Sequence, residues 1–184
     1  ETLLDKGTFV ELDKFVVHRC TNYGMERHRI PGDGVVSGYG KIDGRQVFVY
    51  AYDFTVLGGS LSATNAQKIV KIQTMGLKNG APVIGIFNSA GACINEGVDA
   101  LGAYGEVMRA VAKASGVIPQ IAYIHGICAG SAAVISAMFD VSVSVKDKSS
   151  IYVNPPSLLP GKDAGTADHT ARTGLISKVY DTEA

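Results

Sequence analysis

The sequence predicts a single domain of the α/β class, and three observations carry this prediction. Short apolar runs typical of buried strands alternate with longer segments of helical spacing through the middle of the chain. The chain has 184 residues, of which 46% are hydrophobic, so it is long enough to bury a core. It contains 22 glycines, which indicates many turns, and neither a sequence repeat nor an internal linker divides it.

The first half of the chain predicts a β-hairpin followed by a helix. Strands are expected over 35–42 and 46–51, because Asp43-Gly44 between them is a strong signal for a tight hairpin turn. A helix is expected over 66–77, where the apolar residues have helical spacing. Ser60 or Ser62 can cap its start, and Asn79-Gly80 ends it.

The second half predicts further strands that alternate with helices. Apolar runs predict strands over 83–87, 118–124 and 151–153, and the alternation of Val with Ser predicts a half-buried strand over 141–145. Helices are expected over 101–114, 132–138 and 169–179, although Gly174 weakens the pattern of the last one. Glu96 and Asp99 are candidates to cap the first of these helices or to contact a substrate.

Two turns of very small residues, 88–92 and 128–131, each follow a predicted strand. Both are expected at the edge of the sheet where α/β proteins usually bind ligands. A helix begins near Ala132, and the first N–H groups of a helix lack internal partners and lie at its positive end. Such groups stabilise negative charge on a substrate oxygen without any ionisable side chain. The alternative is a tight turn whose residues are small only for packing.

Composition and charge exclude several classes of function. The formal net charge is zero, which predicts no general electrostatic binding of nucleic acid or of anionic membranes. Cys20, Cys93 and Cys128 are far apart and odd in number, so neither a disulfide framework nor a metal site is expected. No apolar run reaches membrane-spanning length, and no signal peptide is visible. These features predict a reducing, cytoplasmic setting, and the absence of an initial Met suggests an excised domain.

Six stretches of the sequence also carry a specific resemblance. They run over nearly the whole chain as 7–13, 30–40, 53–61, 78–85, 95–99 and the turn Cys128-Ala129-Gly130-Ser131. In this order they resemble the N-terminal half of the carboxyltransferase subunits of biotin-dependent acyl-CoA carboxylases and decarboxylases. The subset that they resemble most is the propionyl- or methylmalonyl-CoA type.

The resemblance implies a crotonase-like fold, a spiral of ββα units, with residues 1–184 as the N-terminal, acyl-CoA-binding domain. It implies carboxyl transfer between carboxybiotin and the alpha carbon of a short acyl-CoA. In the family, biotin is carried by a partner, the biotin carboxyl carrier protein, and its freed nitrogen takes the substrate proton. The biotin side of the site comes from a C-terminal carboxyltransferase domain that this chain lacks. A homo-oligomer is expected, in the cytoplasm or, in a eukaryote, in the mitochondrial matrix.

The same resemblance implies roles for particular residues. The backbone amides of Gly130 and Ser131 would hold the thioester oxygen while the enolate forms. The acyl-CoA site would be lined by a larger set, namely Ala90, Gly91, Ala92, Ala129, Gly58, Gly59 and Phe54, although Phe54 is also a candidate core residue. Arg27 is a candidate contact to the CoA phosphates, or else part of a solvated lead-in.

The sequence departs from the family pattern at four positions. Asn88 stands in place of Asp, Ala90 and Ser131 in place of Gly, and Cys93 in place of Arg. A backbone N–H survives the change to Ser131, whereas the change to Cys93 removes a charge near the pocket. Cys93 and Cys128 are both expected to be small packed residues rather than nucleophiles.

Two alternatives stay open at this point. One is an inert acyl-CoA-binding half that needs its partner domain for turnover. The other is a different crotonase-fold CoA enzyme, of the decarboxylase or hydratase type. Hydratases of that fold carry acids in places that correspond to 132–135 and 152–156, and this sequence has none there. Water addition is therefore disfavoured.

Overall fold

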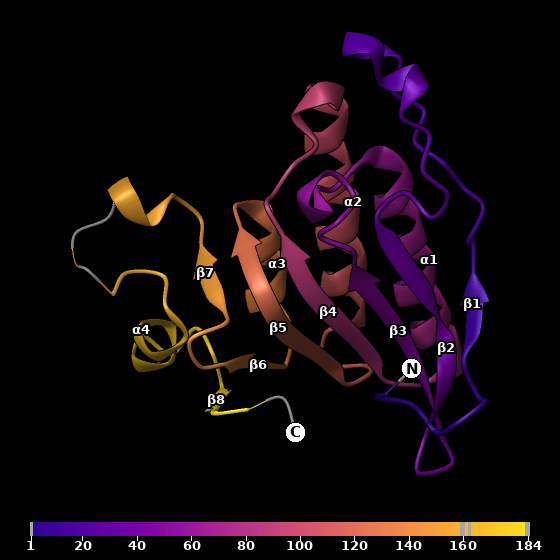
Figure 1. The fold of residues 1–184 in the computed structure, drawn as a ribbon. Helices are drawn as coiled ribbons and strands as arrows, with labels where there is room; N and C mark the ends of the chain where they lie inside the picture. Colours follow the sequence, from indigo (N-terminus) through magenta and orange to yellow (C-terminus); the bar gives the residue numbers. More distant parts are fainter. Residues whose placement is uncertain (1, 159–160, 162, 183–184) are drawn as a thin grey trace.

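The computed structural model describes residues 2–158, 161 and 163–182 as an α/β fold (Figure 1). Short 3-10 turns lie at Asn22–Arg27, Leu57–Gly59, Ile94–Glu96 and Pro156–Leu158. The helices and strands, in chain order, are β1 (Val10–Leu12), β2 (Val35–Ile42), β3 (Arg45–Tyr52), α1 (Ala63–Asn79), β4 (Val83–Ser89), α2 (Val98–Ala114), β5 (Gln120–Ala129), α3 (Ser131–Ala137), β6 (Val141–Val145), β7 (Ser150–Tyr152), α4 (Ala167–Arg172) and β8 (Lys178–Tyr180).

The strands form one sheet in the order β1-β2-β3-β4-β5-β6-β8, with β7 pairing the end of β5. The pairs β1–β2 and β2–β3 are antiparallel, whereas every pair from β3 onward is parallel. The carboxyl ends of β3, β4 and β5 therefore meet at one edge of the sheet. Ligands of α/β proteins bind at this kind of edge.

The hairpin and the first helix form as the sequence predicts. Asp43 and Gly44 have φ values of 50° and 75°, which suits the two-residue turn whose twist matches a hairpin. Ser62 is the N-cap of α1, and its hydroxyl oxygen accepts a hydrogen bond from the N–H of Asn65 at 3.0 Å. Gly80 ends the helix in the left-handed conformation that glycine adopts without strain.

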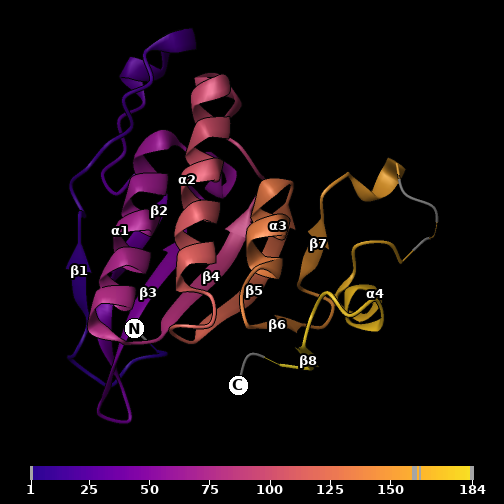
Figure 2. The ribbon, with the colours of Figure 1, turned by 180° about the vertical axis from the view of Figure 1, so that it is seen from behind.

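The helices α1, α2 and α3 all cover one face of the sheet (Figure 2). The main core lies between them and the strands, and its largest fully buried side chains include Tyr50, Phe87 and Tyr104. The opposite face carries a smaller cluster of Val47, Val49 and Ile84, against which the N-terminal segment places Leu4 and Phe9. Helices cover one face of the sheet, and the N-terminal segment packs on the other. The loops that follow several strands therefore meet at the edge of the sheet and not on a face.

Two parts of the chain differ from the prediction. β4 and β5 each run into the small-residue turns, because Ser89 still pairs with Cys128 beyond an irregularity in the ladder. The segment expected as one helix over 169–179 instead ends as α4 and continues into β8, which pairs with β6. β6 is half-buried, as predicted: Ser142, Ser144 and Val145 are buried, whereas Val141 is exposed. Ser142 is tolerated inside because its hydroxyl donates to the carbonyl oxygen of Leu175 at 3.0 Å.

Candidate functional site

Three backbone segments meet at the carboxyl edge of the sheet. The first follows β3 and contains Gly58 and Leu61, and the second follows β4 and contains Ala90 and Gly91. They are joined by hydrogen bonds of 2.9 Å from the N–H of Ala90 to the Gly58 oxygen and from the N–H of Leu61 to the Gly91 oxygen. The N–H of Cys93 also donates to the Leu61 oxygen at 2.9 Å. The structure thus brings together residues that were assigned to the acyl-CoA site only by resemblance.

Glycine at position 59 is required by this close approach. Its φ is 63°, and a Cβ there would lie 2.2 Å from the carbonyl oxygen of Asn88. No side chain fits in that space, so the segment after β3 can lie directly against the end of β4 only because position 59 has none.

The third segment, Ala129 to Ser131, lies beside the second. A Cβ at Gly91 would be 3.7 Å from the carbonyl oxygen of Ala129, which is ordinary contact between the two turns. The hydroxyl of Ser89, which is fully buried, accepts a hydrogen bond from the N–H of Gly91 at 3.2 Å. The two turns that the sequence singled out are therefore neighbours, as expected.

Gly130 requires a correction. Its N–H donates to the carbonyl oxygen of Tyr152 at 2.9 Å, where β7 pairs with the end of β5. That N–H is therefore used inside the protein and does not point at a substrate oxygen as expected. Gly130 instead turns the chain into α3 with φ 59° and ψ −130°, a conformation that side chains disfavour strongly.

Ser131 is the first residue of α3, and a helix supplies no acceptor for the N–H at that position. Among the described residues, neither the N–H of Ser131 nor that of Ala92 has a hydrogen-bond acceptor. Along an extended segment, successive backbone N–H groups point to opposite sides. The N–H of Cys93 points to Leu61, on the β3 side. The N–H of Ala92 therefore points to the opposite side, where β5 lies next to β4.

Phe54 and Arg27 both have exposed side chains. Phe54 is 40% exposed in the loop after β3, so its interpretation as a core residue is wrong. The side chain of Arg27 is 85% exposed. Its segment, the indigo helix beyond the N-terminal end of α2 in Figure 1, is held by hydrogen bonds from Cys20 and Asn22 to the Asn95 oxygen. Among the described residues, these two hydrogen bonds tie the segment to Asn95 and not to Ala129 or Ser131.

The cysteines near the site are packed, as expected. Cys128 is fully buried, and burial raises the pKa of its thiol to about 12. Cys93 is 5% exposed, and burial likewise raises the pKa of its thiol. A thiol that stays protonated at neutral pH is a poor nucleophile. Neither cysteine therefore offers covalent chemistry at this edge.

Asn88 has a role that sequence reasoning missed. Its side-chain oxygen accepts a hydrogen bond from the N–H of Ile127 at 3.2 Å. The amide group lies over Gly126, where a Cβ would be 2.5 Å from that oxygen. It bridges β4 and β5 where the ladder is irregular. A glycine inside a strand, as at Gly126, is the signal that could have revealed this close approach.

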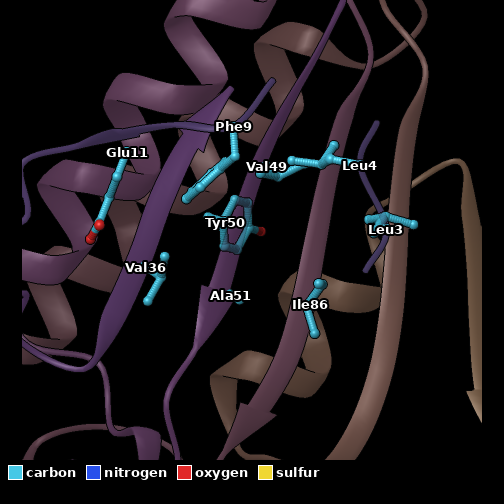
Figure 3. Close-up of a pocket in the computed structure, with 9 residues that line it drawn as sticks. All are labelled: Leu3, Leu4, Phe9, Glu11, Val36, Val49, Tyr50, Ala51 and Ile86. Carbon is cyan, nitrogen blue, oxygen red and sulfur yellow. The ribbon is translucent and has the colours of Figure 1, made fainter. Parts of the chain in front are cut away.

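A cavity of about 290 Å³ lies elsewhere, on the sheet face opposite the helices (Figure 3). Its lining is Leu3, Leu4, Phe9, Glu11, Val36, Val49, Tyr50, Ala51 and Ile86, so Glu11 is its single charged group.

In the described part of the chain, no cluster of three or more His, Cys, Asp or Glu side chains is arranged to hold a metal ion. No described helix is both long and apolar enough to cross a membrane.

Comparison with known proteins identifies the family. A family model described as the carboxyl transferase domain matches residues 1–175. The chain is 53% identical to the propionyl-CoA carboxylase beta chain of Roseobacter denitrificans, over 100% of this chain and 38% of that protein. It is 51% identical to the methylmalonyl-CoA decarboxylase subunit alpha of Veillonella parvula, over 85% of this chain and 31% of that protein.

The fold agrees with these relatives. A crystal structure of transcarboxylase 12S, described as a hexamer with hydrolysed methylmalonyl-coenzyme A bound, matches with a TM-score of 0.93 and 38% identity. The match covers 98% of this chain and 37% of that one. The expected crotonase-like fold is confirmed, and the chain spans between 31% and 38% of the length of these proteins. By the match of the family model and by these identities, the chain belongs to the carboxyl transferase domain family.

Proposed function

We propose that this chain is the N-terminal, acyl-CoA-binding domain of a biotin-dependent carboxyltransferase that acts on a short acyl-CoA. The observation that carries the proposal is the meeting of Gly58 and Gly59, Ala90 to Ala92, and Ala129 to Ser131 at one sheet edge. These are the positions that the family resemblance assigns to the acyl-CoA. The relatives named above act on propionyl-CoA and methylmalonyl-CoA, which supports a short acyl group.

The chemical task of this chain is to stabilise the enolate of the thioester. Loss of a carboxyl group or of a proton from the alpha carbon places negative charge on the thioester oxygen. The N–H groups of Ser131 and Ala92, which have no acceptor among the described residues, are the donors for that oxygen. Each such donor contributes about 2.7–4 kcal/mol to lowering the barrier. A donor fixed in the backbone needs no reorganisation when the charge forms.

Biotin would reach this edge on the biotin carboxyl carrier protein, and its ureido group supplies the carboxyl acceptor or donor. The edge presents uncharged backbone and small side chains, which suits a bulky planar ring next to a thioester. We assign no residue of this chain to biotin. The C-terminal carboxyltransferase domain supplies that side of the site, and the two domains would meet in a homo-oligomer.

The remaining assignments concern the CoA portion. Phe54 is 40% exposed in the loop that joins β3 to Gly58, and an apolar ring there suits the pantetheine arm. Arg27, whose side chain is 85% exposed and lies 3.9 Å from the Glu26 carboxylate, would contact a CoA phosphate. Because Arg27 lies beyond the N-terminal end of α2, the nucleotide portion of CoA would extend along the sheet edge away from Ser131.

The test is an assay of the assembled enzyme, by which we mean this chain with the C-terminal carboxyltransferase domain and the biotin carrier protein. Carboxyl transfer is measured with acetyl-, propionyl- and butyryl-CoA, and decarboxylation with methylmalonyl-CoA. We expect turnover that needs biotin and prefers propionyl- or methylmalonyl-CoA. Turnover without biotin, or none with any of these substrates, would overturn the proposal. Calorimetry of the isolated chain separates binding from turnover, since we expect weak acyl-CoA binding there.

A further inference from the structure

A buried polar cluster lies at the start of α1, outside the three site segments. Asp33, Ser62, Asn65 and Lys68 are each 3% exposed or less. Buried charges and amides are costly unless they are hydrogen-bonded, so a cluster of this kind holds a specific geometry. Residues from the loop before β2 and from α1 are joined here.

The loop before β2 is fixed to α1 by a lysine. The ammonium group of Lys68 donates to the carbonyl oxygen of Gly32 at 2.9 Å and to that of Val35. These carbonyls lie on the two sides of Asp33 in the chain. Asp33 is therefore held in place from both directions.

Asp33 in turn fixes the segment that precedes α1. Its carboxylate accepts a hydrogen bond from the hydroxyl of Ser62. Its backbone oxygen accepts one at 3.0 Å from the side-chain amide of Asn65, which also donates to the Ser60 oxygen at 2.9 Å. Ser60 and Ser62 flank Leu61, the residue that exchanges two hydrogen bonds with the turn after β4.

The helix itself does not need this carboxylate. Ser62 and Asn65 cap α1 reciprocally, and the side chain of Glu96 accepts a hydrogen bond from the N–H of Ala63 at 2.7 Å. Asp33 also has a φ of 49°, between glycines at 32 and 34 that share the left-handed region. Glycine would adopt that backbone with less strain, so the side chain at position 33 is present for its contacts.

On these contacts we propose that Asp33 is a positioning residue for the acyl-CoA site. Through Ser62 and Asn65 it holds the Gly58–Leu61 segment, and through that segment it fixes the Ala90–Ala92 turn. Asp33 raises the fraction of molecules whose site has the geometry that binds acyl-CoA. Its loss therefore weakens the apparent affinity for acyl-CoA and does not change the rate of the chemical step. The inference rests on the proposed function.

The test compares two substitutions that both tolerate a positive φ. Asp33→Gly removes the side chain, and we expect it to raise the KM for propionyl-CoA in the assembled enzyme about tenfold, with kcat changed less than about twofold. Asp33→Asn keeps an acceptor for the Ser62 hydroxyl and should stay within about twofold of the wild type in KM. Asp43→Gly is the matched control, since Asp43 has a φ of 50° in the exposed hairpin turn at the opposite edge.

Hydrogen exchange gives a readout that does not depend on activity. In Asp33→Gly the amides of Leu61, Ala90 and Cys93 should exchange faster, whereas those of the β2–β3 hairpin should not change. Ser62→Gly removes the same hydrogen bond from the other side, at a position where a helix tolerates glycine, and should give the same pattern.

Unchanged exchange and KM in both variants would overturn the inference. So would loss of the fold in both, because the cluster would then serve stability alone. If the wild type itself lacks acyl-CoA turnover, the proposed function fails, while the exchange pattern still decides whether Asp33 positions these segments.

Discussion

The N–H of Gly130 donates a hydrogen bond to the carbonyl oxygen of Tyr152, 2.9 Å away. This contact joins the end of β5 to β7. The next residue, Ser131, begins α3, and its N–H has no acceptor in the described chain. At the start of α2, Gly97 has nearly the same backbone conformation as Gly130, with φ 56° and ψ −126°. The protein therefore contains a second helix start that serves as a matched control.

The role of the Ser131 N–H can be tested by removing that single hydrogen. Proline is tolerated at the first position of a helix, so Ser131→Pro should retain the fold while deleting the donor. We expect kcat of the assembled enzyme to fall about 10²–10³-fold. Val98→Pro makes the same change at the first position of α2 and should leave kcat near the wild-type value. Equal activity in the two variants would show that the Ser131 N–H does not bind the thioester oxygen.

Gly130→Val tests the backbone turn that precedes α3. A side chain at φ 59° and ψ −130° is strained by roughly 1–3 kcal/mol, and a Cβ there meets no described atom within 4 Å. We expect turnover to be abolished while most of the fold is retained, as measured by activity and by circular dichroism. Gly97→Val imposes similar backbone strain, and a Cβ at Gly97 likewise meets no described atom within 4 Å. It should lower the thermal midpoint by as much as Gly130→Val does, without abolishing turnover. Near-normal activity of Gly130→Val would contradict the placement of the site.

Thiol accessibility gives a test that needs no substrate. Cys20 is partly exposed, whereas Cys93 and Cys128 are buried and burial raises the pKa of both thiols, to about 12 for Cys128. Iodoacetamide at pH 8 should therefore modify Cys20 first in the native protein, with all three cysteines reacting in denaturant. Peptide mass spectrometry over time reports the order. Early modification of Cys128 would mean that the end of β5 opens far more readily than its packing indicates.

The pH dependence of stability should reveal Asp33. Burial raises the pKa of its carboxyl above the ordinary 3.8, against the lowering effect of the Ser62 hydrogen bond and of nearby His18. An acid whose pKa is raised by folding binds its proton more tightly in the folded state, so its contribution to stability is lost as pH rises through the folded pKa. The thermal midpoint of the wild type relative to Asp33→Asn should therefore fall as pH increases from about 4. A difference that is constant with pH, or that grows, would contradict this environment for Asp33.

Local residue patterns determined much of the fold. The Asp43-Gly44 turn, the Ser62 cap and the Gly80 stop define the hairpin and α1, because each depends on the conformational preferences of residues close in sequence. The two small-residue turns also follow from strand placement, since parallel strands end at the same sheet edge. Their meeting at the candidate site was therefore predictable from the sequence.

Tertiary structure decided which backbone groups remain available. Tyr152 is 22 positions from Gly130, yet β7 pairing engages its N–H, and this is invisible in the local sequence. Glu96, expected to cap the helix that follows it, instead accepts a hydrogen bond from Ala63 at the start of α1. Likewise, Asp33 and β8 have partners that only the folded chain brings near. The physical reason is common to all four: short-range patterns set backbone conformation, whereas hydrogen-bond partners distant in sequence are chosen only when the whole sheet assembles.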